Sequence, residues 1–125
     1  MGIDIYARWR GQTEEEVIVQ APRFSITSGN VGYLREAYHG EPYATKHLLR
    51  EAFDSPTCCA AISAATLQER LPETLRIAEE RERTVYKEAD PAAIERVLQS
   101  FRDFVALCAA KEQETGEPVE ILASY

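Results

Sequence analysis

The sequence has few cysteines, few histidines and no long apolar run. Its three cysteines are an odd number, and Cys58 and Cys59 are adjacent, a spacing that fits no zinc motif. The two histidines, His39 and His47, are eight residues apart, too far for the i, i+4 pairing of a metal-binding helix face. We therefore expect no metal site and no cofactor. We interpret the cysteines as small, half-buried residues, with a redox or metal role as the weaker alternative.

No apolar segment is long enough to cross a membrane, and the N-terminal segment MGIDIYARWR contains Asp4 and lacks the apolar centre of a secretory signal. Lys and Arg number 14 against 21 Asp and Glu, which gives a net charge of −7 and argues against general affinity for nucleic acid. We expect a cytoplasmic protein that binds neither membranes nor nucleic acid. A nucleic-acid mimic, or a protein that docks on a basic partner, is the weaker alternative, because Arg and Lys are interleaved with the acidic residues.

With 125 residues, 45% of them apolar and 28% charged, the chain has the composition of an ordinary globular protein. We expect a single domain over residues 1–125. Residues 3–9 alternate between apolar and polar, which is typical of a half-buried strand, and residues 119–125 alternate again near the C-terminus. Neither segment could be stable alone, so we infer that the two share a sheet.

The clearest helical pattern lies in the last third of the chain. It begins at Asp90, a good N-cap, and Pro91, a good first residue, and extends to about residue 114, with Gly116 as the stop. Its apolar residues recur at spacings of three and four, as in a buried helix face: Ile94, Val97, Leu98, Phe101, Phe104, Val105 and Cys108.

Weaker helical signals precede it. A capping box from Thr13 to Glu16 starts a helix of one or two turns. A second helix covers 43–53, and a third starts at Ser63 and either kinks or restarts at Pro72.

The remaining segments give short elements. Residues 24–27 indicate a short strand, and residues 34–39 fit a turn or two of helix. The charge run EERER at 79–83 is typical of a solvated helix face, with Glu79 paired to Arg83. The predicted fold is therefore α+β: a small sheet containing the N- and C-terminal strands, covered by three to four helices.

The sequence contains no GxSxG, Walker loop, HExxH or paired CxxC motif. It does contain SGNVG at 28–32, a glycine-rich turn whose backbone N–H groups could hold a phosphate, with Arg35 as the charge partner. The glycines concerned are Gly29 and Gly32. The alternative is that these residues form an ordinary turn.

Tyrosine is concentrated just after this turn. Tyr33, Tyr38 and Tyr43 fall within eleven residues, together with Arg35 and His39. Tyrosine and arginine are favoured at recognition surfaces because each offers a large contact area and a directed polar group. This pattern predicts a binding site, and the alternative is that the tyrosines fix an irregular loop to the core.

Five segments of the chain carry a resemblance: MGIDIYARW, GYLREAYHG, YAT, RLPETL and TGEPVEILASY. Over essentially its whole length the chain resembles a group of short, uncharacterised bacterial and phage proteins. The resemblance implies a self-contained cytosolic protein of accessory function and carries no activity and no site residues.

The leading hypothesis is a binding protein that uses residues 29–47 to hold a small anionic or planar ligand, or a partner protein. The ligand-binding residues would be Gly29, Gly32, Tyr33, Arg35, Tyr38, His39 and Tyr43. One alternative is an enzyme in the same place, with His39 as acid or base and Arg35 stabilising negative charge. Another is a homo-oligomer formed through an exposed edge at Trp9 or Tyr125.

Overall fold

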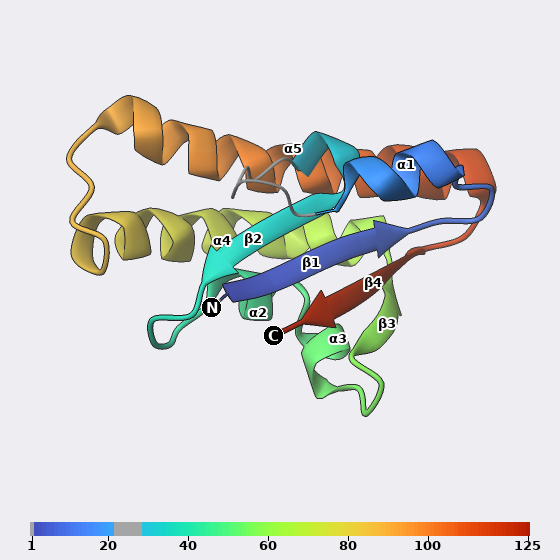
Figure 1. Ribbon diagram of the computed structural model, residues 1–125, viewed down its shortest axis with the longest axis horizontal. Helices are drawn as coiled ribbons and strands as arrows, with labels where there is room; N and C mark the ends of the chain where they lie inside the picture. The colour runs from blue at the N-terminus through green and yellow to red at the C-terminus, as the bar shows by residue number, and fades with distance from the viewer. Residues whose placement is uncertain (1, 22–28) are drawn as a thin grey trace.

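The computed structural model describes residues 2–21 and 29–125 (Figure 1). Within them lies a four-stranded antiparallel sheet in the order β2-β1-β4-β3. The strands are β1 (Gly2–Arg8), β2 (Tyr33–Ala37), β3 (Cys59–Ile62) and β4 (Val119–Ser124). The predicted α+β class, with both terminal segments in one sheet, is confirmed.

The helices are α1 (Glu14–Val19), a 3-10 turn η1 (Gly29–Val31), α2 (Ala44–Leu48), α3 (Arg50–Asp54), α4 (Ala64–Thr84) and α5 (Pro91–Thr115). The long helices α4 and α5 lie side by side as an antiparallel hairpin against the sheet, and their connecting turn extends past the end of β2 (Figure 1). The short helices α2 and α3 follow β2 along the chain and lie near the two termini (Figure 1).

The core lies between the inward faces of the strands β1 and β4 and the apolar face of helix α5. Ile3, Ile5 and Ala7 point to the helical side of β1, and Val119, Ile121 and Ala123 do so from β4. The predicted stripe of α5 covers them, with Phe104 fully buried. As predicted, Asp90 caps α5 by accepting a hydrogen bond from the Ala92 N–H at 3.0 Å, and Gly116 ends it in the left-handed region at φ 77°.

The structure corrects several local predictions. Residues 33–37 form a strand, not helical turns, because pairing with β1 outweighs the weak helical pattern. The helix predicted over 43–53 is two short helices that break at Leu49, where φ is −123° and ψ is 33°. Of the two alternatives at Pro72, the fresh start is wrong, because helix α4 continues through this residue.

One strand, β3, was not predicted, because CAAI has no alternation. The predicted capping box from Thr13 to Glu16 is present in both directions, and α1 has six residues. The strand predicted at 24–27 lies outside the described residues.

The terminal strands are the two central strands of the sheet. β1 pairs with β2 and β4, and β4 pairs with β1 and β3. The prediction that an edge at Trp9 or Tyr125 pairs with another chain is therefore wrong in its choice of strand. Within the described part of the chain, the outer edges of the sheet belong to β2 and β3.

Candidate functional site

The structure separates the predicted site residues into three places. Gly29 lies against α5, so closely that a Cβ atom there would be 1.7 Å from the Ser100 carbonyl oxygen. Gly32 has φ +82°, and its added Cβ would be 2.7 Å from the Gln20 side-chain nitrogen. Both glycines thus allow close packing within the protein, and an ordinary structural turn explains them.

Tyr33 and Arg35 lie together on the face of the sheet that points away from the core. Asp4 on β1 accepts a hydrogen bond from the Tyr33 hydroxyl at 2.5 Å and another from an Arg35 Nη at 2.7 Å. Burial and the bond to Asp4 raise the pKa of Tyr33 well above its usual value. The charge of Arg35 is therefore already matched by Asp4.

The third group follows β2. Tyr43 is buried in the core, and its hydroxyl accepts a hydrogen bond from the Gly40 N–H at 3.0 Å. Tyr38 and His39 are exposed: the Tyr38 ring packs 5.2 Å from that of Tyr43, and the His39 ring 5.7 Å from that of Tyr86. Of the three predicted tyrosines, only Tyr38 is open to solvent.

The most polar part of the interior is a residue pair that the sequence did not single out, Glu36 on β2 and Arg81 on α4. The Glu36 carboxylate accepts hydrogen bonds from the Ala44 N–H at 2.8 Å and the Thr45 N–H at 3.0 Å, which caps α2. The Thr45 hydroxyl adds a third bond at 2.5 Å. The sequence feature that could have revealed this pair is Glu36 itself, a charged residue at an inward-facing position of strand β2.

Arg81 fastens the loop between β2 and α2. Its guanidinium donates to the Gly40 carbonyl at 2.5 Å, the Pro42 carbonyl at 2.9 Å and the Ala37 carbonyl at 3.0 Å. Its Nε lies 3.2 Å from Glu36 Oε2 but is not aligned for a hydrogen bond, so that contact is an ion pair. With both partners more than nine-tenths buried, this pair is part of the fold's framework.

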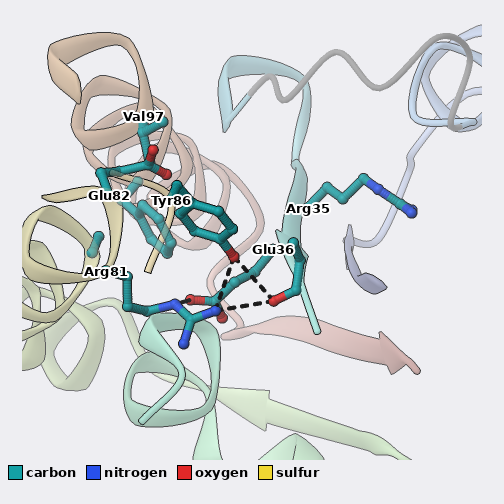
Figure 2. Close-up of a pocket in the computed structure, with 9 residues that line it drawn as sticks. Arg35, Glu36, Arg81, Glu82, Tyr86 and Val97 are labelled. Atoms are coloured by element: carbon teal, nitrogen blue, oxygen red, sulfur yellow. Dashed lines mark hydrogen bonds and ion pairs between the residues drawn. The ribbon is translucent and has the colours of Figure 1, made fainter. Parts of the chain in front are cut away.

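A cavity of about 240 Å³ opens beside this pair, between the edge of β2 and the helices α4 and α5 (Figure 2). We call it the β2–α5 pocket. Its wall consists of Arg35, Glu36, Ala37, Ala78, Arg81, Glu82, Tyr86, Val97 and Phe101. Figure 2 shows the Arg35 side chain leading away from Arg81 and Tyr86, so that residue borders the pocket with its strand backbone.

The unmatched charge of the pocket is negative. Arg35 is paired with Asp4 and Arg81 with Glu36, whereas Glu82 has no ion-pair partner among the described residues. Burial raises the pKa of Glu82, and nearby Glu88 raises it further, while Arg81 opposes the shift. The site therefore offers a partly buried carboxylate, the Tyr86 hydroxyl and apolar walls.

Among the described residues, no group of three or more His, Cys, Asp or Glu side chains could hold a metal ion. None of the described helices is both long enough and apolar enough to pass through a membrane. Comparisons with protein-family models, curated proteins and solved structures gave no match to this chain.

Proposed function

We propose that the protein is a binding module whose β2–α5 pocket holds a cationic group on an apolar stem, such as an amine or a guanidine. The observation that carries the proposal is Glu82, a carboxylate in the pocket wall without an ion-pair partner in the described part of the chain. A bound cation would compensate the negative charge of Glu82 and of the nearby Glu88.

The apolar wall supports the same ligand. Ala78 and Phe101 are buried and Val97 is half-buried, so together they offer a surface for methylene groups. The Tyr86 hydroxyl is a further acceptor, although it already bonds Arg81 at 3.0 Å. A side chain or metabolite with a short alkyl stem and a terminal cation matches this combination.

This proposal keeps the binding function predicted from the sequence but changes the charge of the ligand. The anionic ligand depended on a free Arg35, and both arginines at the pocket have carboxylate partners. The catalytic alternative is not favoured, because His39 is outside the pocket wall and Arg35 is matched by Asp4.

The test is a calorimetric titration with butylguanidine, with butyrate as the anionic comparison. We expect butylguanidine to bind with a Kd in the millimolar range, which is a binding free energy of about −4 kcal/mol. We expect butyrate not to bind. Glu82→Gln is expected to weaken butylguanidine about tenfold, which is about 1.4 kcal/mol. Glu79→Gln removes the same charge from a position of α4 that is paired with Arg83 and lies outside the pocket wall, and it is the matched control.

The pH dependence has a defined sign. Cation binding requires the ionised Glu82 carboxylate, so affinity is full above the Glu82 pKa and falls as the pH drops through it. Because burial raises that pKa above the ordinary 4.5, the decline begins at a higher pH than for an exposed glutamate. Equal affinity in wild type and Glu82→Gln, or preference for butyrate, would contradict the proposed function.

A further inference from the structure

We propose that the cationic group enters the β2–α5 pocket as a lysine or arginine side chain of an extended peptide that pairs with the outer edge of β2. This inference rests on the proposed function and names its partner: a segment of another protein that adds a strand to the sheet. The argument comes from the direction of the β2 backbone groups, the position of the pocket and the charge around it.

Alternate backbone groups of β2 face away from β1. The Ala7 N–H donates to the Gly32 carbonyl at 2.8 Å, and the same antiparallel register places Leu34 opposite Ile5. Since bonded and non-bonded pairs alternate along such a ladder, Leu34 exchanges its bonds with β1, and Arg35 points its N–H and C=O to the outer edge.

Contacts at the end of β2 support this orientation of its backbone groups. The Ala37 carbonyl, two residues after Arg35, accepts from Arg81 at 3.0 Å and from the Tyr86 hydroxyl at 3.4 Å, on the side away from β1. Within the described ranges 2–21 and 29–125, no hydrogen bond engages the Arg35 N–H, the Arg35 C=O or the Ala37 N–H. These three groups can pair with an added strand.

The pocket lies beside these groups. Arg35, Glu36 and Ala37 form its strand wall, and α4 and α5 form the wall on the core side of the sheet. In an antiparallel added strand, the residue opposite Arg35 would exchange two hydrogen bonds with it, and the residue opposite Glu36 would point its side chain into the pocket. We assign the antiparallel direction because every pair in the sheet is antiparallel.

Charge favours a basic peptide over a second copy of this chain. The side chain that enters the pocket meets Glu82, which lacks an ion-pair partner in the described residues. A second copy carries a net charge of −7 and would place its own Glu82 near this edge, so like charges would approach.

The experiment uses the peptide acetyl-Thr-Val-Thr-Lys-Thr-Val-Thr-amide. In an extended strand its lysine side chain points to one face, and the side chains of the two neighbouring threonines point to the other. Binding is followed by NMR of the backbone amides of the full chain. We expect hydrogen exchange at the Arg35 and Ala37 amides to slow on binding, while the Leu34 amide, already bonded to β1, stays unchanged.

Two methylated peptides test the pairing. Methylating the backbone nitrogen of the threonine that follows the lysine, which lies opposite Arg35, removes the donor to the Arg35 carbonyl, and we expect at least a tenfold loss of affinity. Methylating the backbone nitrogen of the lysine itself, which would face solvent, is expected to change affinity less than twofold.

The outcomes separate this inference from the proposed function. If butylguanidine binds but the peptide does not, or if the two methylated peptides behave alike or in the reverse order, the peptide inference is overturned and the proposed function stands. If neither butylguanidine nor the peptide binds, both are overturned.

Discussion

At the scale of single residues, the buried pair of Glu36 and Arg81 decides the path of the chain after β2. Glu36 holds the first N–H groups of α2, and Arg81 holds three carbonyls of the loop before it. The rings of Tyr43 and Tyr86 lie 4.9 and 5.7 Å from the Arg81 guanidinium and complete its surroundings. Each member of the pair would be an uncompensated buried charge without the other.

Arg81→Met is therefore expected to lower the free energy of unfolding by about 3 to 5 kcal/mol, because Glu36 would stay buried without its cation. The control is Arg83→Met, which removes an arginine that is 58% exposed and pairs with Glu79 one turn away on the same helix. Arg83→Met should lower the free energy of unfolding by less than about 0.5 kcal/mol. Urea denaturation measures both, and similar losses in the two variants would refute the structural role of Arg81.

The residue scale also shows where sequence reasoning about the site succeeded. The pairing of Glu79 with Arg83 in EERER is confirmed, with Arg83 Nε 3.2 Å from Glu79 Oε2. Arg81, in the same run, is only 4% exposed and is the exception to the predicted solvated face. The charge run alone does not show which of its residues bonds carbonyl groups far away in the sequence, because that depends on the path of the loop at 38–42 in the folded protein.

At the scale of elements, the turn η1 is held to α5 through Gly29. The Gly29 Cα approaches the backbone of α5 so closely that a Cβ atom would meet both the Ser100 carbonyl oxygen at 1.7 Å and the Phe104 nitrogen at 2.6 Å. Neither atom is the end of a flexible side chain, so one element would have to move away from the other.

Gly29→Ala should thus lower the free energy of unfolding by about 3 kcal/mol or more, as expected for overpacking against backbone. Gly11→Ala is the matched comparison: its φ of +83° is unfavourable for alanine, but nothing lies within 4 Å of the added Cβ. Gly11→Ala should lower the free energy of unfolding by about 1 to 2 kcal/mol. Thermal and urea unfolding give both values, and a smaller loss for Gly29→Ala than for Gly11→Ala would be inconsistent with this packing.

The elements that the sequence predicted well are those whose signals are local. Helix α5 has its own N-cap, stripe and glycine stop, and β1 and β4 alternate over at least six residues. β2 and β3 are shorter, and their structure depends on the neighbouring strand. The glycines and tyrosines near β2 were recognised as unusual, but the fold uses Gly29, Tyr33 and Tyr43 inside the molecule.

At the scale of the whole molecule, a narrow sheet is combined with a long helical hairpin. The hairpin turn passes beyond the end of β2 (Figure 1), and the β2–α5 pocket lies where β2 faces both helices. The position of this pocket could not be predicted from the sequence, because its walls come from residues 35–37, 78–86 and 97–101, which meet only after folding.

The most direct test of the account is the position of bound butylguanidine, measured by nuclear Overhauser contacts between its methylene protons and the methyl groups of the protein. We expect contacts with Val97 and Ala78 in the wall of the β2–α5 pocket. Contacts with the exposed Val17, Ile18 and Val19 of α1 in their place, or none with Val97 at saturating ligand, would contradict the central claim that this pocket is the binding site.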